Sequence, residues 1–219
     1  MVLSESLWPT AVPRWVGCVT FRVELAEEGR ANMTWRGQLL VASPLMGDPN
    51  FERSVVLILA HGEEGALGVV LNRPRVFPIA AQLQRWEALA AAPAVLFEGG
   101  PVASESAIGL ALIAAGRTHP SARPRDLTSF SILTDRVATV DLSEEPQPGI
   151  DKVRVFAGYA GWGAEQLESE VDAGAWFLVP SRPTDVFSSD PDGLWRKVLR
   201  RQRSSLAMLS SYPDDLQTN

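Results

Sequence analysis

Charged side chains crowd the loop of residues 47–54, which separates two apolar runs. Asp48 precedes a proline there, and this order is typical of a turn because the Asp side chain bonds to the backbone ahead of it. Glu52 and Arg53 are adjacent and could form an ion pair or contact a ligand. His61, at the end of the following run, could face the same side. Alternatively, it caps the strand end or bonds to a neighbouring carboxylate.

Two further turns place polar side chains at the ends of apolar runs. Asn72 and Arg73 precede a proline, and Glu98 precedes Gly99 and Gly100. Loops at strand ends often carry binding residues, because the strands hold them in place. If the two ends converge, Asn72, Arg73 and Glu98 form a polar rim. The alternative is that Asn72 and Glu98 bond to loop backbone and hold the turns.

A glycine-rich run, Gly158-Tyr159-Ala160-Gly161-Trp162-Gly163, follows one apolar run and precedes a predicted helix. Glycines at such a junction let the backbone approach a phosphate, which the helix N-terminus can receive. The spacing does not match the dinucleotide fingerprint, and no Gly-Lys-Ser/Thr follows. We therefore favour a glycine corner that packs Tyr159 and Trp162 against the helix, with a small-ligand pocket as the alternative.

Two predicted helices carry charged faces. Glu165, Glu168 and Asp172 share one face of the helix predicted for residues 164–173 and could hold Mg²⁺ or Ca²⁺. A solvated acidic face is the commoner explanation, and we predict no metal site. The helix predicted for residues 194–203 is basic and could touch phosphates, but a solvated face is again favoured. Its cations are Arg196, Lys197, Arg200, Arg201 and Arg203.

Signatures of catalysis are missing from the sequence. It contains no Gly-x-Ser-x-Gly, Ser-x-x-Lys or His-Glu-x-x-His motif. The single cysteine, Cys18, excludes an intrachain disulfide and a cysteine zinc site, and His61 and His119 are the only histidines. We predict no cofactor, and the sequence favours binding over catalysis.

The composition is that of one globular domain. The chain has 219 residues, of which 46% are hydrophobic and 21% charged, and a net charge of −6. An acidic balance argues mildly against a dedicated nucleic-acid binder, so nucleic acid is a possible but not a favoured partner. No apolar run approaches the ~20 residues of a spanning helix, and we predict no membrane association. With one cysteine, a cytoplasmic location is expected.

The pattern of apolar runs and turns predicts an α+β fold: one mixed α/β domain with antiparallel hairpins and a few packed helices. Residues 1–31 are interpreted as a poorly ordered extension, with Met33 as an alternative start, and residues 117–128 as a surface loop. The domain spans residues 32–215. Strands are predicted at 38–43, 54–60, 66–71, 95–98, 107–113, 137–142, 153–159 and 176–179, and helices at 79–91, 164–173 and 194–203.

Several blocks, in this order along the chain, resemble the YqgE/AlgH family of bacterial proteins. They are residues 36–74, the turn 98–102, the run 154–170 and the ending 207–215. The resemblance covers roughly residues 34–215 and implies a mixed α+β fold. One branch of the family is named for regulating alginate production, which implies transcriptional regulation as an alternative function.

We predict a non-enzymatic binding or regulatory protein whose partner is an unidentified protein or small molecule. Its surface would be built by loops 47–53, 72–74, 98–101 and 158–163. The candidate residues are Asp48, Glu52, Arg53, His61, Asn72, Arg73, Glu98, Gly99, Gly100, Gly158, Tyr159, Gly161 and Trp162. A further alternative is a carboxylate- or metal-assisted hydrolase that uses Glu52, His61 or Glu98.

Overall fold

A computed structural model of the chain describes residues 34–79, 83–116, 130–134, 136–203 and 205–213. The extension 1–31, with Cys18, and the alternative start Met33 lie outside this part. So do His119 and the whole surface loop predicted at 117–128.

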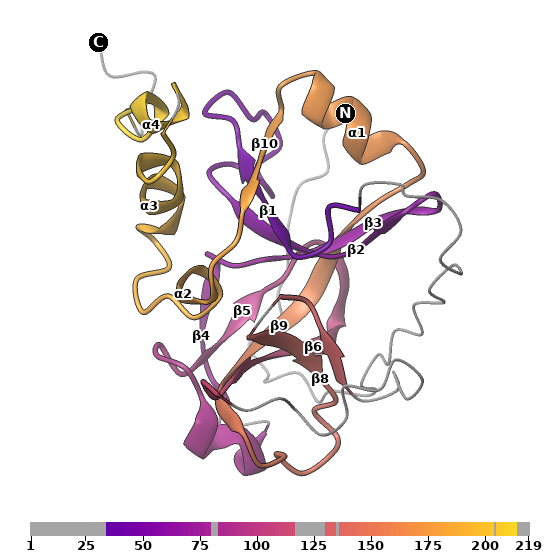
Figure 1. The fold of residues 1–219 in the computed structure, drawn as a ribbon, viewed down its shortest axis with the longest axis vertical. Helices are drawn as coiled ribbons and strands as arrows, with labels where there is room; N and C mark the ends of the chain where they lie inside the picture. The colour runs from indigo at the N-terminus through magenta and orange to yellow at the C-terminus, as the bar shows by residue number, and fades with distance from the viewer. Residues whose placement is uncertain (1–33, 80–82, 117–129, 135, 204, 214–219) are drawn as a thin grey trace, which may run out of the picture.

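Ten strands of the described residues form one mixed sheet, and the long strand β9 (Ile150–Trp162) belongs to both of its halves. The first half pairs its strands in the order β10-β1-β2-β3-β9, all antiparallel (Figure 1). Its strands are β1 (Gln38–Ala42), β2 (Val55–Gly62), β3 (Gly65–Val70) and β10 (Trp176–Pro180).

The second half surrounds the N-terminal part of β9. There β9 pairs antiparallel with β6 on one side and parallel with β5 on the other, where Phe97 lies opposite Phe156. This parallel pair makes the sheet mixed. The remaining strands are β4 (Pro74–Pro78), β5 (Val95–Glu98), β6 (Val102–Ile113), β7 (Phe130–Ile132) and β8 (Val137–Val140).

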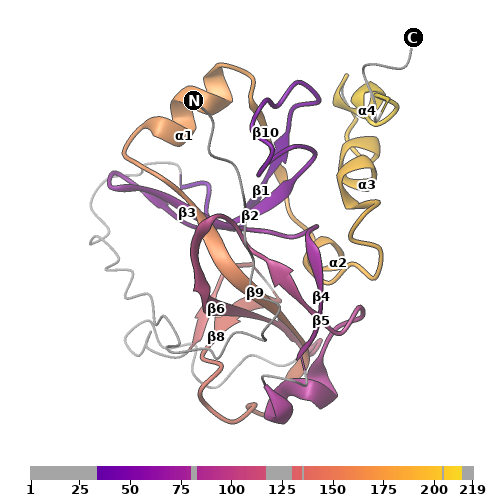
Figure 2. The ribbon, with the colours of Figure 1, turned by 180° about the vertical axis from the view of Figure 1, so that it is seen from behind.

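The helices are short and lie around the sheet. Helices α3 and α4 stack along one side of the first half, and α1 lies at its end (Figures 1 and 2). A 3₁₀ helix, η2, packs against β9 in the second half. The helices are η2 (Gln84–Leu89), α1 (Gln166–Asp172), α2 (Pro183–Val186), α3 (Leu194–Arg200) and α4 (Leu206–Leu209).

Both faces of the first half are buried, which explains why β1 and β2 read as continuous apolar runs. Successive side chains of a strand point to opposite faces. Leu39 and Leu57 therefore share one cluster with Leu194 and Trp195 of α3. On the other face, the alternate residues of the same two strands join α1 and the indoles of β9 and β10. That second cluster includes Leu40, Val56, Trp162, Leu167 and Trp176.

The α+β prediction is confirmed, with three local differences. The helix predicted at 79–91 is a 3₁₀ helix over Gln84–Leu89, and residues 80–82 lie outside the described part. The run 158–163 was expected after a strand, but all of it except its last residue lies inside β9. Strands β4 and β7 and helices α2 and α4 were not predicted, because each is short and two of them begin or end at prolines.

Candidate functional site

Asn72 joins the two polar loops that precede β2 and follow β3. Its Oδ1 accepts the Val55 N–H at 2.9 Å, and its Nδ2 donates to the Arg53 carbonyl at 2.9 Å. The side chain is buried, so Asn72 bonds to loop backbone as the alternative interpretation expected. Arg53 itself has a φ of 49°, a left-handed conformation that is costly for a non-glycine residue and often occurs at functional sites.

The turn after β5 meets the same region. The Glu98 N–H donates to the Arg73 carbonyl at 2.8 Å, and the Gly99 N–H donates to the Ala157 carbonyl of β9 at 2.7 Å. A Cβ on Gly99 would lie 2.2 Å from the Gly158 carbonyl oxygen, so this approach of two strands requires glycine. Loops 47–53, 72–74 and 98–101 therefore converge, and the turn 98–101 also meets Gly158 at the start of the fourth predicted loop.

Other candidate residues form contacts that stabilise the loops. The Asp48 Oδ1 accepts the Asn50 N–H at 2.9 Å, which closes the expected turn. Glu98 forms an ion pair with Arg75 at 2.9 Å. The Arg73 guanidinium bonds to the Glu52 carbonyl, while the Glu52 side chain is exposed.

The glycine-rich run divides between two clusters. Trp162 packs towards α1, where Glu170 accepts hydrogen bonds from the Nε1 of Trp162 at 3.0 Å and of Trp176 at 2.9 Å. The packing interpretation is thus confirmed for Trp162. Tyr159 instead packs against the core cluster beneath α3, and Gly161 is exposed. Gly100 approaches the Tyr159 carbonyl, where a Cβ would lie 2.3 Å from the oxygen.

His61 lies at the α1 side of the sheet. Its Nε2 is 3.0 Å from Glu168 Oε1, its Nδ1 accepts the Trp35 N–H at 3.4 Å, and its ring stacks on Trp35. His61 therefore contacts a neighbouring carboxylate, which agrees with one of the two alternatives predicted for it. The acidic face predicted for helix α1 is therefore only partly formed. Glu168 contacts His61, and Glu165 precedes the helix in a left-handed conformation.

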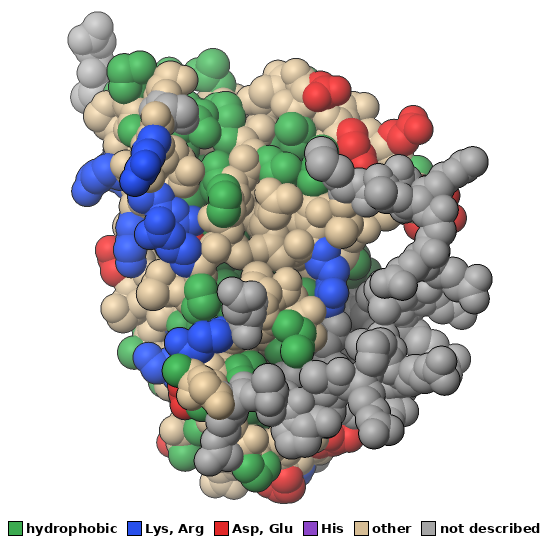
Figure 3. All heavy atoms as spheres, viewed as in Figure 1, with side chains coloured by type: hydrophobic (Ala, Val, Ile, Leu, Met, Phe, Trp, Pro, Cys, Tyr) green, Lys and Arg blue, Asp and Glu red, His purple; other side chains and the backbone are tan. Residues whose placement is uncertain are grey.

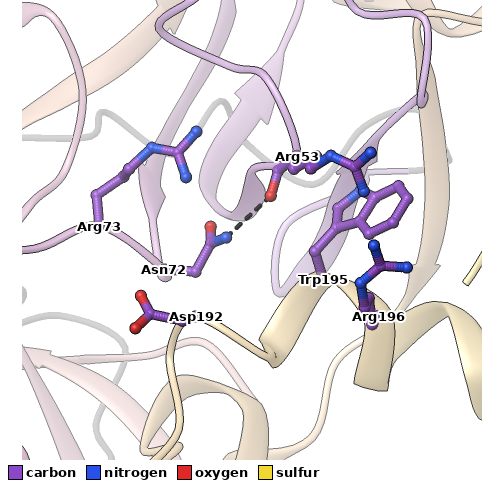
Figure 4. Close-up of a pocket in the computed structure, with 6 residues that line it drawn as sticks. All are labelled: Arg53, Asn72, Arg73, Asp192, Trp195 and Arg196. Carbon is purple, nitrogen blue, oxygen red and sulfur yellow. Dashed lines mark hydrogen bonds between the residues drawn. The ribbon is translucent and has the colours of Figure 1, made fainter. Parts of the chain in front are cut away.

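A pocket of about 170 Å³ opens where the converged loops meet the start of α3. We call it the arginine pocket. Figure 4 shows Arg53 and Arg196 on two sides of Trp195, with Arg73, Asn72 and Asp192 beside them. Six residues line it: Arg53, Asn72, Arg73, Asp192, Trp195 and Arg196.

Trp195 forms the rigid part of this pocket. Its Nε1 donates to the Ala42 carbonyl at 2.8 Å, and the side chain is buried. The Arg53 Cζ lies 4.8 Å from the ring centroid, and the Arg196 Cζ lies 5.8 Å away. Both distances are within the range of cation–π attraction, which orients the guanidinium planes.

The C-terminal segment, residues 206–213, also touches these two arginines. Arg196 Nη1 donates to the Ser210 carbonyl at 2.5 Å, and its Nη2 donates to the Tyr212 carbonyl at 2.9 Å. Arg53 donates to the Pro213 carbonyl. The indole and these backbone oxygens therefore contribute to positioning the two guanidiniums.

Arg154 is buried against residues 186–188, at the start of the segment that leads from α2 to α3 and the pocket. Its Nη1 donates to the Val186 carbonyl at 3.0 Å, and its Nη2 donates to the Ala92 and Ser188 carbonyls at 2.7 and 3.0 Å. Burial lowers the pKa of the Arg154 guanidinium to about 10. Its Cζ lies 4.3 Å from the Phe97 ring centroid.

The basic helix splits into two sets of cations. Arg201 pairs with the buried carboxylate of Asp185 and with the Pro180 carbonyl, so its role is structural. By contrast, Lys197, Arg200 and Arg203 are exposed.

Sequence reasoning identified half of the pocket, namely Arg53, Asn72 and Arg73. It assigned no site role to Asp192 or Trp195, and it gave Arg196 only a place on a charged helix face. The available signal was the Pro-Asp-Gly turn that begins the helix, followed by Leu194 and then by Trp-Arg.

The described part of the chain contains no group of three or more His, Cys, Asp or Glu side chains that could hold a metal ion. None of its helices is long and apolar enough to cross a membrane.

The sequence model of the AlgH-like family matches residues 39–207. A UPF0301 protein of Streptomyces coelicolor is 48% identical over 186 residues, which cover 84% of this chain and 94% of that protein. The crystal structure of DIP2367 from Corynebacterium diphtheriae has a TM-score of 0.75 and 32% identity, and covers 84% of this chain and 95% of that one. The solution structure of the AlgH protein from Pseudomonas aeruginosa has a TM-score of 0.57 and 26% identity, and covers 86% and 99%.

Proposed function

The chain belongs to the AlgH-like family, and from that premise we propose that it is a non-enzymatic binding protein whose arginine pocket takes a small anionic ligand. The observation that carries the proposal is the set of three guanidiniums, from three separate elements, around one buried indole.

Charge supports an anionic ligand. Among the described residues, three arginines and one aspartate line the pocket, and these four carry a formal charge of two positive units. A guanidinium presents its N–H groups in a fixed fork that matches the oxygens of a carboxylate or a phosphate. The pocket is also smaller than the ~300 Å³ at which drug-sized sites begin, so a compact anion fits it best.

Preorganisation supports binding as well. Arg53 is held in a left-handed backbone conformation next to Asn72, and Trp195 is anchored to the Ala42 carbonyl. Groups that are ordered before the ligand arrives lose less conformational entropy when it binds.

The chemistry of the lining favours binding over catalysis. Guanidiniums do not exchange protons at neutral pH, and the Asn72 amide is engaged in two backbone hydrogen bonds. Among the described lining residues, Asp192 is the one that could act as a base, and it is exposed. The hydrolase candidates Glu52, His61 and Glu98 are not among the lining side chains.

The test is calorimetric titration of the full chain with inorganic phosphate, sulfate and acetate. Arg73→Gln removes one guanidinium whose bond in this structure is to the Glu52 carbonyl. We expect affinity for the preferred anion to fall about 10-fold or more, because a hydrogen bond to a charged group contributes about 1.5–3 kcal/mol. The matched control is Lys152→Gln, which removes the same charge from an exposed position on β9. Equal affinity in both variants would contradict the proposal.

Transcriptional regulation through nucleic acid is the second candidate. It is favoured by the exposed Lys197, Arg200 and Arg203, in a region where basic side chains gather over α3 (Figure 3). Phosphate contacts of this kind give salt-dependent binding. Duplex DNA binding that is unchanged in a Lys197→Ala, Arg200→Ala double variant would argue against it.

We also propose a cytoplasmic location, because a chain with one cysteine suits a reducing compartment. Cell fractionation with detection of the untagged chain tests this point.

A further inference from the structure

Two side chains of opposite charge line the arginine pocket without pairing with each other. Figure 4 shows the Arg73 guanidinium and the Asp192 carboxylate on either side of the Asn72 side chain. Within the described part of the chain, no hydrogen bond or ion pair engages the Asp192 carboxylate, and Arg73 has no carboxylate partner. The pocket therefore presents a cationic and an anionic group to the same ligand.

The turn before α3 is closed without the Asp192 side chain. The Asp190 Oδ1 accepts the Gly193 N–H at 3.1 Å, which is the usual way in which an aspartate stabilises a turn. The Leu194 N–H donates to the Pro191 carbonyl at 3.1 Å and completes it. Asp192 instead lines the pocket and is exposed, so its carboxylate is accessible to a ligand.

The Arg73 side chain is oriented for the opposite end of such a ligand. Its Nη2 donates to the Glu52 carbonyl, and the side chain is half-buried. A guanidinium carries several N–H donors in one plane, so a single backbone bond orients it and leaves others for an oxyanion. Arg53 and Arg196 add positive potential to the pocket, and neither has to give up a contact for this.

We propose that the ligand of the arginine pocket is a small zwitterion, whose carboxylate or phosphate bonds to Arg73 and whose ammonium group pairs with Asp192. This assignment rests on the proposed function, because it names the class of ligand for the same pocket. Asp192 repels a simple anion but attracts the positive group of a zwitterion. One side chain thus favours the zwitterion and disfavours the anion, which is an effective way to obtain specificity.

NMR titration of the full ¹⁵N-labelled chain at constant ionic strength compares each zwitterion with the anion that lacks its amino group. The carboxylate pairs are glycine with acetate, β-alanine with propionate, and γ-aminobutyrate with butyrate. The phosphate pair is phosphoethanolamine with ethyl phosphate. The reporters are the backbone amides at Arg73 and 192–196.

We expect at least one zwitterion to bind about three-fold or more tighter than its matched anion, because an exposed ion pair contributes a modest attraction. The pair that shows the preference identifies the anionic group as a carboxylate or a phosphate. This comparison uses the unaltered protein, so no variant has to fold for it.

Asp192→Asn should reverse the preference. We expect it to weaken binding of the preferred zwitterion about three-fold or more, and to tighten binding of the matched anion about three-fold. A general loss of folding would instead weaken binding of both ligands. The matched control is Asp172→Asn, which removes the same charge from an exposed position on α1 and should leave both affinities unchanged.

The outcomes separate the two proposals. If none of the probes shifts these amides, the proposed function and the zwitterion both fail. If the anions bind but no zwitterion binds tighter than its matched anion, the pocket is an anion site and the zwitterion is wrong. Asp192→Asn that changes the affinities for a zwitterion and its anion in the same direction would also overturn the zwitterion, because Asp192 would then not contact the ammonium group.

Discussion

Replacement of Arg154 by Met should destabilise the protein by about 3 kcal/mol. The side chain is 1% exposed and donates to three carbonyls. Charged hydrogen bonds of this kind contribute about 2 kcal/mol each, so their loss costs about 6 kcal/mol. Against this stands the cost of burying the charge, because burial lowers the pKa of the Arg154 guanidinium to about 10, which corresponds to about 3 kcal/mol.

Urea unfolding, followed by tryptophan fluorescence and circular dichroism, measures this difference. For a domain of this size, about 3 kcal/mol corresponds to a fall of about 6–12 °C in melting temperature. The control is Arg85→Met, because Arg85 also donates to a carbonyl, that of Ser143, but is exposed. We expect a change there of about 0.5 kcal/mol or less.

The destabilisation caused by Arg154→Met should not vary between about pH 6 and about pH 9. Both pKa values of Arg154 lie above this window, so the side chain is a cation in the folded and in the unfolded chain. Above pH about 10 the folded side chain releases its proton first, and the cost of burying the charge falls there. If Arg154→Met lowers the free energy of unfolding as little as Arg85→Met does, Arg154 does not stabilise the segment that leads to α3, and the reasoning is wrong.

Three further substitutions test other parts of the account. Glu170→Gln should lower stability by about 1–2 kcal/mol in thermal melts, because an amide oxygen replaces the carboxylate that binds two indoles. Gly99→Ala should cost about 2 kcal/mol or more in urea, since its Cβ would meet the Gly158 carbonyl, whereas Gly62→Ala, with open space around it, should cost less than 1 kcal/mol. Asp192→Asn should tighten phosphate binding about three-fold by calorimetry, because it removes a like charge from the pocket. Weaker phosphate binding in this variant would contradict the placement of Asp192 beside the bound anion.

The strands of the first half could be predicted because both of their faces are buried. The continuous apolar runs of β1 and β2 leave no alternative to a buried strand or helix, and flanking turns limit their length. The end of β9 could not be predicted in the same way. Gly158 and Gly161 resemble a break, but the left-handed φ of Gly158 and its close approach to the Gly100 carbonyl keep it within the sheet.

Only the pocket residues that lie close together in the sequence could be predicted as a group. Arg53, Asn72 and Arg73 occupy turns that flank consecutive strands, so the sequence pattern places them together. Trp195 reaches the Ala42 carbonyl across 153 positions of the chain, and no periodicity within α3 encodes that contact. Arg154 was hidden for a related reason: one cation in an apolar strand gives no indication of the three carbonyls that surround it.

The central claim is that the arginine pocket binds an anion, and a phosphate titration of the ¹⁵N-labelled chain followed by NMR tests it most directly. The account predicts saturable shifts of the Trp195 indole N–H and of the backbone amides at Arg53, Arg73 and 192–196, and Arg73→Gln should raise the phosphate concentration that saturates them about 10-fold or more. Shifts confined to another region such as α1, or shifts that persist unchanged in Arg73→Gln, would contradict it.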